Sequence, residues 1–326
     1  MKLPLLSPII LFLVLPVSAF ALLLAATTAA PSAKELLAAG RVDEAIDSLG
    51  QHLQHFPADA ESQNLLCRAY YMNEEWDRGI SACEKARSLD PQNSFFNLWL
   101  ARIYGEKADR AGFVSAAGLV KKVRTSFERA VELDPKNWEA RADLAEFYIE
   151  APAIVGGGKD KAREQADAII PANPGIGHWI LARIAAKDKD APGAEREYRV
   201  SIEASRGTAQ SWLHLAQILA RANRFDEMDQ ALHTMESSPL DRPDALLDGA
   251  SLLLSTGRDS PLALRLVRRY LSAPVEEGPA FKAHDVLGQL LEKQGDRRAA
   301  AEEYRTALAL SHTYTHARQD LKRVDH

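Results

Sequence analysis

Apolar and small residues recur at helical spacing in two neighbouring stretches of the chain, residues 60–71 and residues 77–90. In the first stretch, Leu66, Ala69 and Tyr70 fall on one face of a helix. The equivalent face of the second stretch is made of small and apolar residues: Gly79, Ile80, Cys83 and Ala86. A polar turn separates the two stretches, so the pattern predicts a pair of antiparallel helices.

This helix-turn-helix unit repeats along the chain. Pro57 and Pro91, which follow successive second helices, stand 34 residues apart, and Pro135 and Pro174 end later copies. A period of 34 residues with this order of large and small residues resembles the tetratricopeptide repeat family, and the chain looks like an exported bacterial-type member. The resemblance implies an all-α, right-handed superhelical solenoid of about eight helix-turn-helix repeats.

We expect one solenoid over residues 31–326, because no single repeat can bury its apolar face alone. Two copies are longer than the others, which places insertions near residues 105–119 and 151–158, both between a first and a second helix. The copy at 243–272 is degenerate, and residues 315–324 are expected to form a capping helix with a polar face.

Residues 1–30 have the layout of an export signal, with Lys2 followed by the apolar run 3–26. Small residues near 19–21 and 28–30 offer cleavage sites for a signal peptidase. The run is also long enough to be an uncleaved membrane anchor. In both cases the repeats are exported, which predicts a periplasmic protein or one anchored facing the periplasm.

Composition and charge narrow the class of partner. The chain is 46% hydrophobic and 26% charged, which is typical of a folded soluble protein. Its net charge of −5 and the lack of a Lys/Arg block argue against nucleic acid as a partner. The resemblance instead implies a protein or peptide partner, with contact to a membrane only through an uncleaved N-terminal segment.

One motif resembles a phosphate-binding loop, the run Gly156-Gly157-Gly158-Lys159. The match fails, because Asp160 stands where the motif needs Ser or Thr, and the flanking elements are two helices rather than a strand and a helix. We therefore interpret the glycines as a wide turn and expect no nucleotide or other cofactor.

Two histidine pairs, His52 with His55 and His312 with His316, have spacings that would place two imidazoles on one helix face. Neither pair has an obvious third ligand, so we expect solvated helix faces and no metal. The sequence contains no identifiable Ser/His/Asp arrangement and no Cys-x-x-Cys motif. The chain is therefore predicted not to be an enzyme.

Cys67 and Cys83 are the only cysteines and belong to the same repeat. Each stands eight residues from the turn near Glu75, so antiparallel helices would bring them opposite each other. An oxidising compartment would permit a disulfide. Two buried thiols that fill helix-packing positions are the alternative, and the sequence leaves both open.

In solenoids of this family, first-helix side chains line the concave surface. Transferring the repeat pattern residue by residue predicts a partner groove of aromatic, arginine and other side chains: Arg68, Tyr71, Phe95, Leu98, Arg102, Glu146, Trp179, Arg183, Leu213 and Gln217. Phe95 and Trp179 fit the core between repeats equally well. If Arg102 and Arg183 face the groove, replacing both should weaken partner capture and leave unfolding nearly unchanged.

The sequence thus favours a non-catalytic scaffold of the cell envelope that binds a protein or peptide in its concave groove. A membrane-anchored accessory subunit of an envelope assembly or secretion complex is the alternative. An enzyme built on a helical solenoid would need a polar cluster that the sequence does not reveal.

Overall fold

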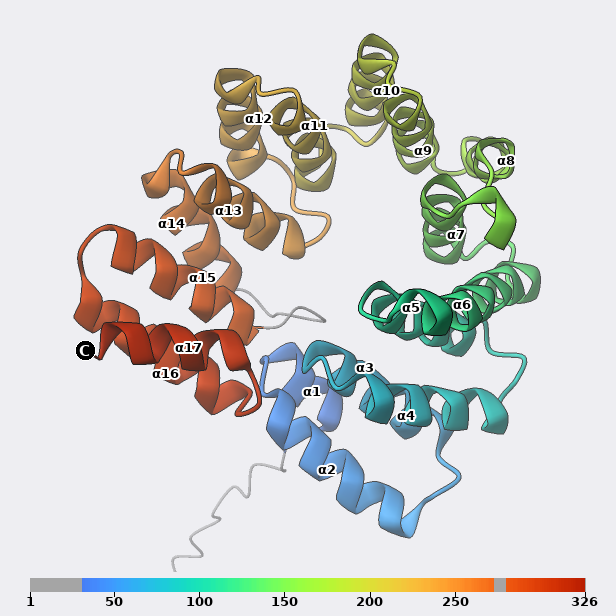
Figure 1. The fold of residues 1–326 in the computed structure, drawn as a ribbon, viewed down its shortest axis with the longest axis horizontal. Helices are drawn as coiled ribbons and strands as arrows, with labels where there is room; N and C mark the ends of the chain where they lie inside the picture. The colour runs from blue at the N-terminus through green and yellow to red at the C-terminus, as the bar shows by residue number, and fades with distance from the viewer. Residues whose placement is uncertain (1–30, 273–279, 326) are drawn as a thin grey trace, which may run out of the picture. The chain divides into compact units, whose positions relative to one another are not determined.

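The computed structural model describes residues 31–272 and 280–325, and these residues form α-helices with no strand. The helices follow one another as antiparallel pairs (Figure 1). The first helices of the pairs are α1 (Ala33–Ala38), α3 (Ala60–Met72), α5 (Ser94–Asp109), α7 (Trp138–Glu150), α9 (Pro174–Lys187), α11 (Ala209–Arg221), α13 (Asp244–Thr256) and α15 (Ala280–Lys293). The second helices are α2 (Val42–His55), α4 (Trp76–Leu89), α6 (Phe113–Leu133), α8 (Lys159–Ile169), α10 (Ala191–Ala204), α12 (Phe225–Ser237), α14 (Ser260–Leu271) and α16 (Arg297–Leu310). The last helix is α17 (Thr315–Val324).

Asparagine side chains set the start of several first helices. The Oδ1 atom of Asn93 accepts hydrogen bonds from two backbone amides of α5, and the Oδ1 atoms of Asn137 and Asn173 cap α7 and α9 in the same way. Each cap follows the end of a second helix by a few residues. The recurring turn therefore ends one pair and begins the next.

Small residues allow the helices to approach closely. Gly79 on α4 is buried, and a Cβ there would lie 2.2 Å from Cδ1 of Ile103 on α5. Leu100, Ala101 and Tyr104 of α5 are almost completely buried in the same core. Each pair thus packs against the next, and the predicted all-α solenoid of helix-turn-helix repeats is confirmed.

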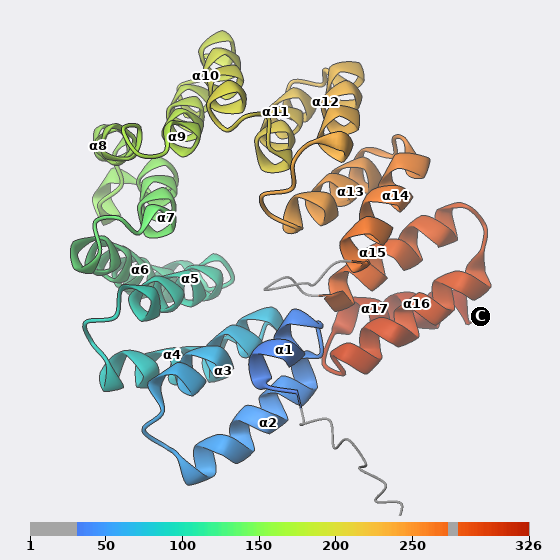
Figure 2. The same cartoon turned by 180° about the vertical axis from the view of Figure 1, so that it is seen from behind.

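The last helices lie beside the first ones in both views of residues 31–325 (Figures 1 and 2). The Ser311 hydroxyl, which is buried, donates to Oδ1 of Asn73 at 2.9 Å, and the backbone amide of His312 donates to Oδ2 of Asp43 at 2.7 Å. Lys282 forms an ion pair with Glu74 at 3.0 Å. Residues more than 200 positions apart therefore share one interface.

Cys67 on α3 and Cys83 on α4 are joined by a disulfide, with their Cα atoms 5.2 Å apart. Both side chains are completely buried. Of the two states that the sequence left open, the structure contains the bonded one. The bond links the two helices of a single repeat.

The two long copies differ in how they use their extra residues. Residues 105–119 extend α5 and α6, which are joined by a short turn at 110–112. Residues 151–158 contain a 3-10 helix, η1 (Ala153–Val155), and a glycine turn. In that turn Gly156 has a φ of 101°, and a Cβ on Gly157 would lie 1.8 Å from the Ala151 carbonyl oxygen.

The predicted export signal or anchor at residues 1–30 lies outside the described residues. None of the helices in residues 31–272 and 280–325 combines the length and the apolar content needed to cross a bilayer. The predicted capping segment is present as α17, where Ala317 and Val324 are buried and Arg318 and Arg323 are exposed.

Candidate binding groove

A cavity of about 1060 Å³ lies along the first helices in the middle of the chain. It is lined by the N-terminal halves of α7, α9 and α11, by the turns that precede them, and by residues 241–244 before and at the start of α13. Two serines near the end of α10, Ser201 and Ser205, complete the lining. Three consecutive repeats and the start of the next one thus build a single cavity.

Aromatic rings form part of the cavity lining. Trp138 opens α7, and Trp179 on α9 stacks on His214 of α11 with ring centroids 5.2 Å apart. Burial and the positive charges of Arg183 and Arg242 lower the pKa of His214 to about 3. The imidazole is therefore neutral at pH 7 and acts as a flat polar surface that also contacts Gln210 at 2.8 Å.

Arg102 does not lie free in a groove. Its Nε atom donates to Oδ2 of Asp143 at 2.7 Å, and its NH2 group donates to Oε1 of Glu139 at 2.7 Å, so α5 is tied to α7. The side chain is only 17% exposed, and its guanidinium carbon lies 4.9 Å from the ring centroid of Trp99. Burial raises the pKa of Asp143, although Arg102 opposes this effect.

Arg183 on α9 makes the corresponding connection to α7. It forms ion pairs with Glu146 and with Glu150, the latter at 3.1 Å, and its side chain is 15% exposed. Lys187 adds a second cation on Glu150 at 2.6 Å. The predicted groove residues Arg102, Glu146 and Arg183 therefore serve mainly to connect the first helices of successive repeats.

The predicted groove residues of α3 and α5 belong to an aromatic cluster. The guanidinium carbon of Arg68 lies 5.6 Å from the ring centroid of Phe95 and 5.2 Å from that of Trp99. The Tyr71 ring meets Trp99 edge-on at 5.5 Å, and its hydroxyl donates to Glu106 at 3.2 Å. Burial raises the pKa of Tyr71, so this hydroxyl remains protonated.

Leu98 and Leu213 are both completely buried, so the prediction that they face the groove is wrong. Neighbouring helices cover that face of α5 and α11, and both leucines belong to the core. Gln217, one turn further along α11 than Leu213, is partly exposed. Of the predicted groove residues, Trp179 is the one found in the lining of the cavity among the described residues.

The sequence interpretation missed Trp138, Asp143, His214, Arg242 and Asp244, which all line the cavity. A sequence signal does exist for some of them. Trp138 directly follows the helix-capping Asn137, and His214 follows Gln210 by one helical turn. Asp244 belongs to the degenerate copy at 243–272 and Arg242 directly precedes it, so the repeat pattern gives neither residue a register.

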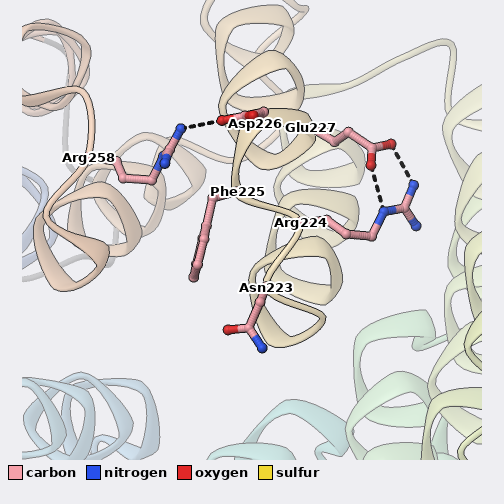
Figure 3. A pocket seen from close by; sticks show the side chains of 6 residues that line it. All are labelled: Asn223, Arg224, Phe225, Asp226, Glu227 and Arg258. Carbon is pink, nitrogen blue, oxygen red and sulfur yellow. Dashed lines mark hydrogen bonds and ion pairs between the residues drawn. The ribbon is translucent and has the colours of Figure 1, made fainter.

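A second cavity, of about 330 Å³, lies at the start of α12 (Figure 3). Arg258 points at Asp226 with a contact of 2.7 Å and also binds Asp229, while its guanidinium carbon lies 5.7 Å from the Phe225 ring. Arg224 binds Glu227. These ion pairs neutralise the charges of the cavity, so it offers little to a ligand.

Residues of the other candidate motifs have protein partners. His52 binds Asp59 at 2.8 Å, and His312 binds Asp43 at 2.7 Å. Lys161, which follows the glycine turn, donates to the carbonyl oxygen of Gly156 at 3.1 Å. This turn thus presents a carbonyl to a lysine rather than its amides to an anion.

Two segments of the chain match models of a known repeat family. Residues 36–94 and residues 281–313 each match a family model described as tetratricopeptide repeat. Both segments consist of the helix pairs described above, one at each end of the described chain. A search of curated proteins finds no match.

Solved structures were also compared with this chain. The crystal structure of yeast Tom70 is 16% identical and covers 87% of this chain and 58% of the Tom70 chain, with a TM-score of 0.53. This chain therefore spans somewhat more than half of Tom70. A thermophilic TPR protein of Thermus thermophilus is 17% identical and covers 58% of this chain and 95% of its own, with a TM-score of 0.48. At 16% identity the likeness to Tom70 concerns the fold alone.

Proposed function

We propose that this protein is a non-catalytic scaffold that binds a protein or peptide partner in the cavity lined by α7, α9, α11 and the start of α13. The observation that supports this most directly is the cavity of about 1060 Å³ with Trp138 and Trp179 in its lining. Large aromatic side chains in a concave site are the usual anchors of protein recognition.

The surrounding packing makes the site rigid. Arg102 holds α5 against α7, and Arg183 holds α9 against α7 through Glu146. A site built on helices that are fixed to each other loses little conformational entropy when a partner binds. This favours recognition of an extended segment by a preformed surface.

We further propose that the protein acts in the envelope of a bacterial-type cell, on the periplasmic side. The apolar segment at residues 1–30 and the disulfide between Cys67 and Cys83 both support export to an oxidising compartment. A membrane-anchored accessory subunit of an envelope assembly or secretion complex differs only in keeping the N-terminal segment. N-terminal sequencing of the mature chain distinguishes the two.

Filling the cavity tests the binding function. Ala142 is small and lines the cavity, so Ala142→Trp places a large ring in the space that a partner would occupy. We expect recovery of the partner by affinity capture from the source cells, under mild cross-linking, to fall at least about tenfold. The matched control is Phe56→Trp, because Phe56 is 60% exposed and lies outside the cavity.

Thermal unfolding of both variants reports whether the fold is retained. Capture that is unchanged in a folded Ala142→Trp protein would contradict the proposed binding site. Equal loss in the Phe56→Trp control would point to an effect unrelated to the cavity.

A further inference from the structure

The charges that line the large cavity do not balance. Its lining contains carboxylates from α7, from the start of α13 and from the connecting turns: Asp134, Glu139, Asp143, Asp241 and Asp244. The cations of the lining are Lys136 and Arg242. Even when Arg102, which binds Glu139 and Asp143, is counted, an excess of negative charge remains.

Most of these carboxylates already have a structural task. Asp134 accepts the backbone amide of Lys136 at 2.9 Å, and Asp241 accepts the backbone amide of Gln210 at 3.2 Å. These two carboxylates therefore stabilise turns that line the cavity. Glu139 and Asp143 are paired with Arg102. The carboxylates with the weakest contacts are therefore those on α13.

Among the described residues, the polar contacts of the Asp244 side chain are long, 3.7 Å to Arg242 and 3.5 Å to the Tyr270 hydroxyl. Asp248 lies one turn further along the same face of α13, and its side chain is exposed. In the described part of the chain, Asp248 has no hydrogen bond or ion pair. Two carboxylates four residues apart on one helix face are like charges one turn apart, which is unfavourable. The surrounding protein, and to a smaller extent the negative charge of Asp244, raise the pKa of Asp248 to about 6.

The aromatic side chains complement this charge. The faces of indole rings attract cations, and Trp138 and Trp179 both line the cavity. His214, which stacks on Trp179, is neutral at pH 7 and therefore does not repel a cation. The cavity thus combines aromatic faces with uncompensated carboxylates.

We propose that the cavity recognises a basic segment of the protein partner, with lysine or arginine side chains placed against the indoles and close to Asp244 and Asp248. This inference rests on the proposed binding function and specifies the chemistry of the partner. A bound cation relieves the repulsion between the two carboxylates and balances the excess charge of the lining. An acidic segment would add to the negative charge.

Binding of short fluorescent peptides to the full-length protein tests the proposal, with fluorescence anisotropy as the readout. The probes are a peptide that alternates lysine, arginine and serine, and a matched peptide with glutamate in place of every basic residue. We expect the wild-type protein to bind the basic peptide at least about tenfold more tightly than the acidic one. Equal affinities, or a preference for the acidic peptide, would overturn the proposal.

A second experiment removes the negative charges of Asp244 and Asp248. The double substitution Asp244→Asn with Asp248→Asn is expected to weaken binding of the basic peptide at least about fivefold. The matched control is Asp160→Asn with Glu164→Gln, a carboxylate pair with the same spacing on exposed positions of α8. Equal effects of the two double substitutions would assign the binding to the net charge of the protein, against the proposal.

The basic specificity and the scaffold function can fail independently of each other. A partner that is captured through the cavity by an acidic or uncharged segment would leave the scaffold function standing and refute the basic specificity. Binding of the basic peptide without any captured protein partner would refute the scaffold function alone.

Discussion

Replacing both Cys67 and Cys83 by alanine is expected to lower the free energy of unfolding by about 3 kcal/mol, because the bond closes a loop with a sequence separation of 16 residues. Both sulfur atoms are buried, so the substitution also removes atoms from the packed interface between α3 and α4. Chemical denaturation measures the change, and hydrogen exchange should show the largest loss of protection in α3 and α4.

A reductant provides the control for this prediction. The wild-type protein, unfolded and refolded with a reductant, should approach the stability of the double variant, whereas the double variant should not respond to the reductant. If reduction leaves the wild-type protein as stable as before, the disulfide does not contribute to stability.

Arg102→Ala is expected to destabilise the protein by about 2 kcal/mol, since it leaves the partly buried Asp143, whose side chain is 29% exposed, without its ion-pair partner. This reverses the expectation from sequence, in which Arg102 faced a groove and could be replaced at no cost. Burial already raises the pKa of Asp143, and loss of the cation raises it further. A carboxyl with a raised pKa in the folded state costs stability as the pH rises through that value, so the loss should be smaller at pH 5 than at pH 8.

Two further variants isolate the role of the ion pair. The effect of Arg102→Ala should shrink in a protein that already carries Asp143→Asn, because position 143 then has no charge that needs a partner. Arg298→Ala is the matched control, since Arg298 is 93% exposed and its ion pair with Glu302 spans 3.6 Å; we expect it to cost less than about 0.5 kcal/mol. Equal stabilities of Arg102→Ala and Arg298→Ala would show that the ion pair between Arg102 and Asp143 does not stabilise the fold.

The repeat architecture could be predicted because it depends on local chemistry. Pro91 and Pro135 end helices, and Asn93 and Asn137 begin the next ones, so the period of the pattern is also the period of the structure. Even the degenerate copy at residues 243–272 forms the helix pair α13 and α14. The neighbouring repeats supply the packing that its own sequence specifies weakly.

The groove could be predicted only in part, because helical spacing gives the direction of a side chain and not the depth at which a neighbouring helix covers it. The repeat pattern predicts the same surface for Leu213 and Trp179, yet Leu213 is completely buried and Trp179 lines the cavity. Similarly, the pairing of Arg102 with Asp143 joins residues 41 positions apart in consecutive repeats. Spacing within one helix contains no information on such contacts.

Contacts between the first and last repeats were beyond any pattern in the sequence. The hydrogen bond from Ser311 to Asn73 joins residues 238 positions apart. This contact depends on the total rotation along the solenoid, which is the sum of the small rotations between successive repeats, and each insertion changes that total. A Cβ on Gly40, which has a φ of 70°, would lie 2.2 Å from Cβ of Ala280, so this interface also requires a glycine that appears ordinary in the sequence.

The central claim is that a protein partner occupies the cavity lined by Trp138 and Trp179, and site-specific photo-cross-linking tests it most directly. A benzophenone amino acid is placed at Trp138 in one protein and at the exposed Phe56 in another, each is produced in the source cells, and adducts are identified by mass spectrometry after irradiation. We predict one dominant protein adduct from position 138 that position 56 does not form. Adducts from position 56 alone, or no protein adduct from position 138, would contradict the claim.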